Sequence, residues 1–134
     1  VTLQQTLKNG VSEKIAGFVI PLCATIHLSG STMKITACAI ALMILHGMPF
    51  DFTLFAGFIF MLGIAMVAAP GVPGGAIMAA VGILQSMLGF NDEMIGLMIA
   101  LYIAMDSFGT ACNVTGDGAI ALVIEKITKE KLVA

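Results

Sequence analysis

Residues 52–91 of this 134-residue chain read FTLFAGFIFMLGIAMVAAPGVPGGAIMAAVGILQSMLGFN, forty residues without a charged side chain. A straight membrane helix needs about 20 apolar residues, so the run is long enough for two of them. Its centre, Ala-Pro-Gly-Val-Pro-Gly-Gly over residues 69–75, places two prolines and three glycines in seven positions and cannot continue a helix. The run therefore predicts two apolar helical arms of about 17 and 15 residues, joined by a non-helical tip.

Two arrangements of these arms are open: two membrane crossings joined by an external loop, or a re-entrant hairpin whose tip lies at membrane depth. An external loop would normally carry charged or strongly polar side chains, and this tip has none. Irregular backbone at membrane depth persists only where it is buried in protein or lines a cavity. We favour a re-entrant hairpin over 52–90, which makes its tip a candidate site element; the alternative for the tip is a plain turn.

Composition indicates an all-α membrane protein. Hydrophobic residues make up 59% of the chain and charged residues 10%, and the mean hydropathy is +1.06. This apolar content excludes a disordered chain. Six lysines and no arginine are too few for a phosphate-tracking surface, which argues against nucleic-acid binding. The chain opens on a polar stretch without an initiator methionine, so we expect a fragment of a longer protein.

The segment over 13–46 predicts a broken transmembrane helix. Its uncharged run from Ile15 to Met33 is interrupted by Pro21 and by the polar block His-Leu-Ser-Gly-Ser-Thr over 27–32. We expect a short helix, an unwound segment and a second short helix over 32–46. Unwinding frees carbonyl groups for a cation, and the next helix offers N–H groups to an anion. A simple Gly/Ser kink is the alternative.

The final helix, expected over 92–131, carries the strongest functional signal. Four polar residues recur at offsets of 0, 4, 7 and 11, within about 60° of one helix face: Asp106, Thr110, Asn113 and Asp117. A carboxylate in hydrocarbon costs at least about 2.5–3.5 kcal/mol, so such residues face protein or a hydrated cavity. Their oxygens suit a hard cation such as Na⁺ or a substrate ammonium, not a transition metal. A polar packing seam is the alternative.

Three motifs in order resemble the sodium:dicarboxylate (dicarboxylate/amino acid:cation) symporters, a family that includes the glutamate transporter homologues. They are Pro21–Ser31, Gly71–Met78 and Asp106–Asp117. The resemblance covers nearly the whole chain. It implies the C-terminal part of a transport domain: the end of a first hairpin (1–12), the broken helix (13–46), the re-entrant hairpin (52–90) and the final helix (92–131). The N-terminal scaffold helices would then be absent, and the full-length protein would be a homotrimer.

The resemblance also implies roles for individual residues. Asp106 matches the carboxylate that receives the substrate amino group, and Val72 lies in the tip that closes over the substrate. The other implied substrate-binding positions are Ser31, Gly109, Thr110 and Asn113.

Sodium sites are implied in the same way. Asp117 and Asn113, with the carbonyl of Cys23, match one site, and Thr25 with the carbonyls just before Gly71 matches another. His27 stands where the family has an asparagine sodium ligand.

Two departures from the family pattern bear on ions and substrate. The usual Asn-Met-Asp-Gly-Thr motif is here His-Leu-Ser-Gly-Ser over 27–31, so Ser29 replaces a carboxylate and a third sodium site is not expected. Members that take acidic substrates carry arginine three residues after the aspartate, where this chain has Gly109. Nothing else in the chain is expected to pair a substrate's side-chain carboxylate.

These features predict sodium-coupled symport of an amino acid, neutral or polar rather than acidic, by alternating access with the hairpin as gate. The protein would be a multi-pass protein of the cytoplasmic membrane, without an organic cofactor. The alternatives are symport of a dicarboxylate or acidic amino acid, proton (H⁺) coupling through His27, and a non-transporting structural module. An enzyme is not expected, because Asp106 and Asp117 lie about 16 Å apart along the helix axis, too far for one reacting centre.

Overall fold

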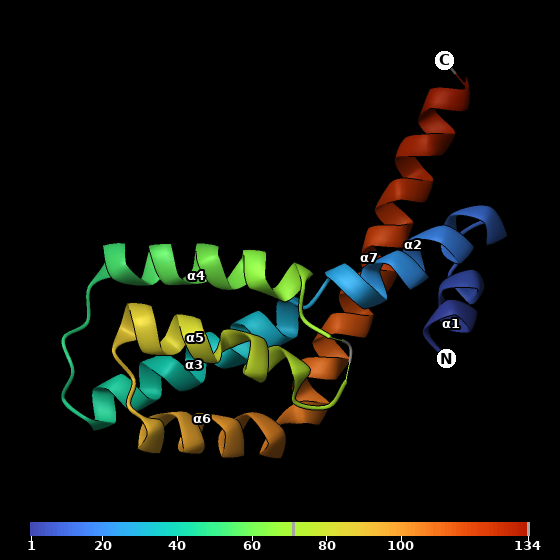
Figure 1. The fold of residues 1–134 in the computed structure, drawn as a ribbon. Helices are drawn as coiled ribbons and strands as arrows, with labels where there is room; N and C mark the ends of the chain where they lie inside the picture. Colours follow the sequence, from blue (N-terminus) through green and yellow to red (C-terminus); the bar gives the residue numbers. More distant parts are fainter. Residues whose placement is uncertain (71, 134) are drawn as a thin grey trace.

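The computed structural model describes residues 1–70 and 72–133, with side chains as far as Lys129. This part of the chain is built from helices, shown in Figure 1. They are α1 (Thr2–Lys8), α2 (Glu13–Ile26), α3 (Ser29–Leu45), α4 (Phe52–Val67), α5 (Gly75–Leu88), α6 (Asp92–Ala104) and α7 (Asp106–Val133). The all-α fold class predicted from the sequence is confirmed.

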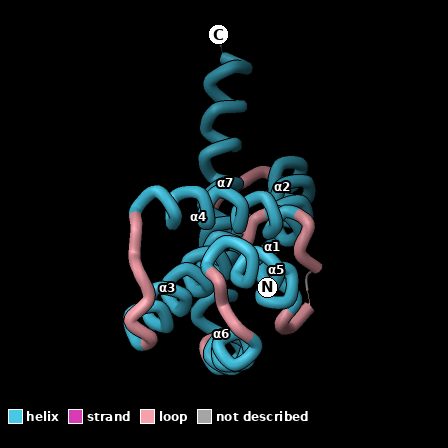
Figure 2. The backbone as a smooth tube through the Cα atoms, turned by 60° about the vertical axis from the view of Figure 1, so that its left-hand side comes forward, coloured by secondary structure: helices cyan, strands magenta, loops and turns pink. Residues whose placement is uncertain are grey.

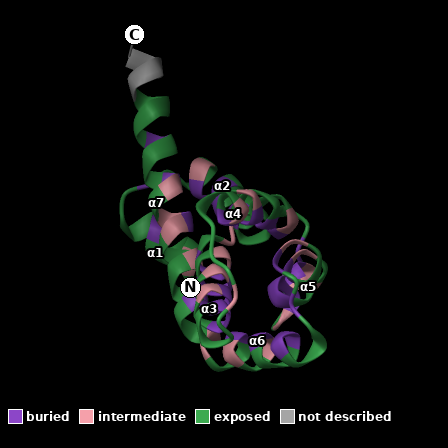
Figure 3. Ribbon diagram, turned by 90° about the vertical axis from the view of Figure 1, so that its left-hand side faces the viewer, coloured by how far each residue is buried: buried purple, intermediate pink, exposed green. Residues whose placement is uncertain are grey.

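Helices α3, α4, α5 and α6 pack around the larger of two apolar cores. In Figure 3 the buried faces of these helices turn toward one another and the exposed faces point outward. Each helix contributes side chains with no exposed surface, among them Ile35, Phe58, Ile77, Leu84 and Met98. The outer surface of α4 is also apolar, with Phe52 and Phe60 exposed. Such a surface is expected for a helix that contacts lipid or another apolar helix.

Helix α7 connects this four-helix body to a smaller second core. It leaves the body and runs to the C-terminus, while α1 and α2 pack along it, as Figures 1 and 2 show from two directions. The second core joins Val19 and Ile20 of α2 to Ala121 of α7. Polar contacts close the far end, where Ser12 donates hydrogen bonds from its backbone N–H and its hydroxyl to Glu125 Oε2, at 2.9 and 2.7 Å.

The broken helix is present, but its break is shorter than predicted. Only His27 and Leu28 lie outside α2 and α3, and α3 begins at Ser29 rather than at residue 32. The first turn of α3 is stabilised from outside, because the N–H of Gly30 donates to Asn113 Oδ1 of α7 at 2.8 Å. A Cβ at Gly30 would overlap the carbonyl oxygen of Gly109, so only glycine lets the two helices cross this closely.

The hairpin arms have nearly the predicted lengths. Helices α4 and α5 contain 16 and 14 residues, and Asp51 caps α4 by accepting a hydrogen bond from the N–H of Leu54 at 3.0 Å. The tip between them includes Gly74, which directly precedes α5 and has a φ of 78°, in the left-handed region that favours glycine. Gly71, a tip residue in the predicted motif, lies outside the described residues. The re-entrant placement of the tip in a bilayer stays a prediction.

The segment 92–131, expected as one helix, is two helices in the structure. Helices α6 and α7 meet at Met105 with a bend of 62°. The carbonyl groups of Tyr102 and Met105 accept hydrogen bonds from Lys34 Nζ, at 3.1 and 3.4 Å. A side chain from α3 therefore binds the C-terminal end of α6 where the helix breaks.

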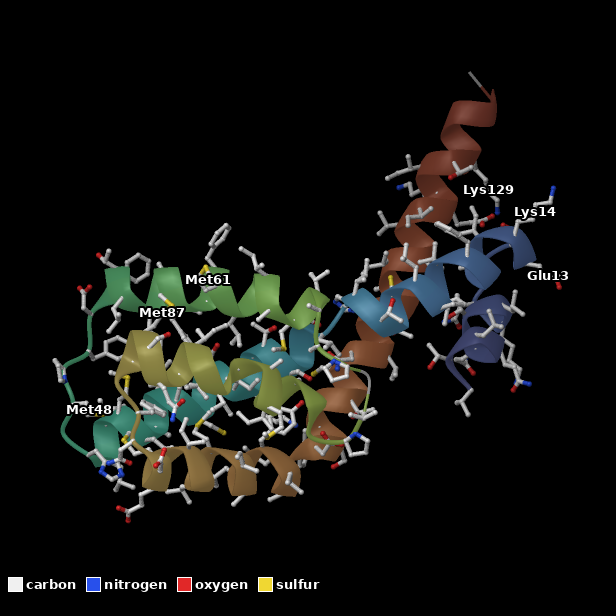
Figure 4. All side chains as sticks on the ribbon, viewed as in Figure 1. Glu13, Lys14, Met48, Met61, Met87 and Lys129 are labelled. Carbon is white, nitrogen blue, oxygen red and sulfur yellow. The ribbon has the colours of Figure 1, made fainter. Side chains whose placement is uncertain are left out.

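Within the described residues, one helical segment is long and apolar enough to cross a membrane, Glu13–Leu45, which includes α2, the break and α3. The two helical segments Asp92–Ala104 and Asp106–Lys129 are together long and apolar enough for a second membrane span, if the bent pair is taken as one helix. Figure 4 shows charged side chains at the α2–α7 end, with Glu13, Lys14 and Lys129 labelled, and Met48, Met61 and Met87 on the four-helix body.

Candidate substrate and cation site

A cavity of about 340 Å³ lies where the α2–α3 break, the hairpin tip, the end of α6 and the first turns of α7 meet. The sequence placed its candidate residues on three separate segments of the chain. The structure brings seven of them to the walls of this one cavity: His27, Ser31, Val72, Asp106, Thr110, Asn113 and Asp117.

The α7 stripe forms one wall of the cavity. All four of its members contribute, so the prediction that they share a helix face is confirmed. Their exposure differs, because the side chain of Asp106 is 47% exposed while that of Asp117 is 5% exposed. Asp106 is thus open to a ligand that enters the cavity, whereas Asp117 lies in the protein interior.

Asp117 is bound to the broken helix. Its Oδ1 lies 2.7 Å from His27 Nδ1, a hydrogen-bond distance that becomes an ion pair when the imidazole is protonated. Gly116 makes this approach possible, since a Cβ there would overlap the imidazole ring. The contact links α7 to the α2–α3 break at the floor of the cavity.

A second polar network joins α3, α6 and α7. The hydroxyl of Tyr102 donates to Ser31 Oγ at 3.0 Å, and Asn113 Nδ2 donates to the same oxygen at 3.5 Å. Asn113 Oδ1 is already the acceptor of the Gly30 N–H. The carboxamide of Asn113 is therefore held in one orientation at the cavity wall.

Sequence reasoning missed two residues of the site, Tyr102 in the cavity lining and Lys34 beside it. The side chain of Lys34 is 6% exposed, and Nζ lies 3.4 Å from Asp106 Oδ1 and 3.5 Å from the centroid of the Tyr102 ring. The Lys34 ammonium occupies the space beside Gly109, since a Cβ at Gly109 would lie 3.2 Å from Nζ. Lysine as the single charge in the otherwise uncharged segment 15–50 was the signal that could have pointed to it.

Three predicted site residues lie outside the cavity lining. The Thr25 hydroxyl donates to the carbonyl of Leu22 at 2.7 Å within α2, and its side chain is exposed. The carbonyl of Cys23 accepts the N–H of His27 at 2.8 Å. Gly109 is buried where α7 crosses α3.

The donor set fits a hard monovalent cation better than a transition metal. No three His, Cys, Asp or Glu side chains converge anywhere in the described part of the chain. Near the α2–α3 break the donor groups are the Asp117 carboxylate, the Asn113 carboxamide, backbone carbonyls and the His27 imidazole, so all but one of these kinds of donor supply oxygen. Hard cations prefer such oxygen ligands.

Comparison with known proteins agrees with this architecture. The model of the sodium:dicarboxylate symporter family matches residues 1–127. The chain belongs to this family. The predicted resemblance is therefore confirmed.

Curated relatives of this symporter-family chain include two kinds of amino acid transporter. Excitatory amino acid transporter 3 from Mus musculus is 30% identical over 93% of the chain and 24% of the relative. Neutral amino acid transporter B(0) from Rattus norvegicus is 31% identical over 82% of the chain and 20% of the relative. The chain thus spans about a quarter of the length of these relatives. No solved structure gives a significant match.

Proposed function

We propose that this chain is the substrate- and ion-binding part of a sodium-coupled amino acid symporter of the cytoplasmic membrane. The observation that supports this most directly is the α7 stripe. Its two carboxylates, hydroxyl and carboxamide line one cavity, together with a helix break and a hairpin tip. Ligand sites of transporters form at such interruptions, where irregular backbone lines a cavity. Family membership and the names of the relatives agree with the proposal.

The substrate is a neutral or polar amino acid. Asp106 receives its ammonium group, while Thr110, Asn113 and Ser31 supply hydrogen-bonding groups around it. The contacts of Lys34 support the proposal that the substrate's side chain is neutral. The three N–H groups of the lysine ammonium are directed at Tyr102 O, Met105 O and Asp106 Oδ1. In the empty site, no donor of this ammonium is left for a carboxylate on the substrate side chain.

Two sodium ions bind beside the substrate. Asp117, Asn113 and the Cys23 carbonyl form one site, and Thr25 with the carbonyls before Gly71 forms a second. His27 stands where the family has an asparagine ligand of a third sodium ion, and its imidazole contacts the Asp117 carboxylate instead. A third sodium ion is therefore not part of the proposal.

The hairpin tip is the gate. Val72 lines the cavity and is 60% exposed, as expected for a residue that covers a ligand and is released with it. In this proposal the chain works within a longer protein that supplies scaffold helices and a trimer interface. The rival in a different class is a structural membrane module in which the α7 stripe is a packing seam.

The test is uptake of radiolabelled L-serine and L-alanine by the longer protein in proteoliposomes, with and without a sodium gradient. We expect the gradient to raise uptake by about tenfold or more, since typical coupling between two ligands is roughly 5–150-fold. Aspartate as the best competitor would contradict the neutral specificity. Absence of both uptake and amino acid binding by the purified protein would favour the structural module.

Proton coupling through His27 is the second candidate, favoured by the 2.7 Å contact between His27 Nδ1 and Asp117 Oδ1. A protonated imidazole carries a positive charge, so a proton on His27 can take the place of a cation at Asp117. Under this reading, His27→Gln abolishes the pH dependence of uptake. A glutamine variant that keeps the dependence contradicts it.

A further inference from the structure

The Lys34 ammonium has one charged partner and several neutral ones. Asp106 is the only carboxylate within ion-pair distance in the described part of the chain, at 3.4 Å. The remaining partners lie at the C-terminal end of α6 and its junction with α7: the carbonyls of Tyr102 and Met105 and the face of the Tyr102 ring. The nearby acid Asp117 is paired with His27 instead. Lys34 and Asp106 therefore form a local pair without net charge.

The two members of this pair differ in their freedom to change partner. Lys34 is buried behind the cavity wall and keeps two carbonyl groups and a ring if Asp106 is taken from it. Asp106 lines the cavity with nearly half of its side chain exposed. A ligand ammonium can reach the carboxylate, whereas Lys34 is not among the residues that line the cavity. The carboxylate is thus the group that exchanges partners.

Charge compensation matters most when the site is empty. For net uptake, a carrier that works by alternating access must return across the membrane without substrate, and an uncompensated carboxylate at membrane depth opposes that step. We propose that Lys34 is a tethered counter-ion, which neutralises Asp106 in the empty site and yields it to the substrate ammonium on binding. The empty site then returns without a free cation bound at Asp106. This inference rests on the proposed symport function.

The packing at Gly109 supports a fixed place for this ammonium. A Cβ at that position would lie 3.2 Å from Lys34 Nζ and 3.3 Å from Cε, so any larger residue there competes with the lysine for space. The absence of a side chain at Gly109 of α7 thus leaves the space that the Lys34 ammonium from α3 occupies.

The experiment compares two transport modes of the longer protein in proteoliposomes. Net uptake of a labelled neutral amino acid into empty vesicles requires the empty return, whereas exchange against internal unlabelled amino acid does not. In the Lys34→Met variant we expect net uptake to fall about tenfold or more relative to exchange, since the empty site then carries an uncompensated charge. Lys34→Gln, which keeps a hydrogen-bond donor without the charge, should show the same selective loss.

Lys129→Met is the matched control. Lys129 is 67% exposed, pairs with Glu125 at 2.9 Å and lies outside the cavity, so its replacement should leave the ratio of the two modes unchanged. A merely structural role of Lys34 would lower both modes together, and that result overturns the inference. No change in either mode overturns it as well.

The unaltered protein provides a test that needs no variant. If Lys34 compensates Asp106, net uptake should proceed at a rate comparable to exchange. Exchange that exceeds net uptake by about tenfold or more in the unaltered protein contradicts the inference. Failure of the unaltered protein to transport any amino acid in either mode would instead contradict the proposed function.

Discussion

Replacing Asp106 with asparagine is expected to weaken amino acid binding by about 100-fold or more, because the substrate ammonium loses its charged partner. Asparagine has nearly the same shape, so the change removes charge without opening a cavity. The variant also leaves the Lys34 ammonium with carbonyl and ring partners alone. Equilibrium binding of labelled L-serine to the purified longer protein measures the effect.

Asp92→Asn is the control for this variant. Asp92 is an exposed carboxylate in the first turn of α6 and accepts a hydrogen bond from Gln85 Nε2 at 3.3 Å. Its replacement removes the same charge from the surface, and binding should stay within about twofold because surface substitutions of this kind have small effects. Undiminished binding in Asp106→Asn would contradict the substrate role of this carboxylate.

The parts of the fold that sequence reasoning predicted are those determined by local patterns. The apolar run over 52–91 with its Pro/Gly centre was enough to predict two arms of nearly the observed lengths. Helical periodicity placed Asp106, Thr110, Asn113 and Asp117 on one face, and all four line the cavity. Such features depend on residues a few positions apart, which a single sequence displays directly.

The features that were missed depend on contacts between distant residues. The break at Met105 involves carbonyls bound by Lys34, about 70 positions earlier in the chain. The early start of α3 involves a hydrogen bond to Asn113, 83 positions later. No proline or glycine marks the α6–α7 junction, so local propensity favoured one continuous helix. Tertiary contacts of side chains thus override local propensity at both ends of the site.

Replacing Asp117 with asparagine is expected to raise the sodium concentration needed for half-maximal uptake by about tenfold or more. A buried carboxylate attracts a cation far more strongly than a neutral carboxamide does. Asp117 is 4% exposed and lies 2.7 Å from His27, so the lost charge is not replaced by solvent. Uptake of labelled L-alanine as a function of sodium concentration measures the shift.

The two aspartate variants should separate in their effects, because the two carboxylates lie at opposite ends of the α7 stripe. At saturating sodium, Asp117→Asn should still bind the amino acid, whereas the affinity of Asp106→Asn should stay about 100-fold or more weaker at every sodium concentration. Glu13→Gln, at the exposed start of α2 far from the cavity, should leave both affinities unchanged. If Asp117→Asn keeps its sodium dependence and loses only amino acid affinity, the two carboxylates have a single shared role, and the separation of substrate and cation sites along α7 is wrong.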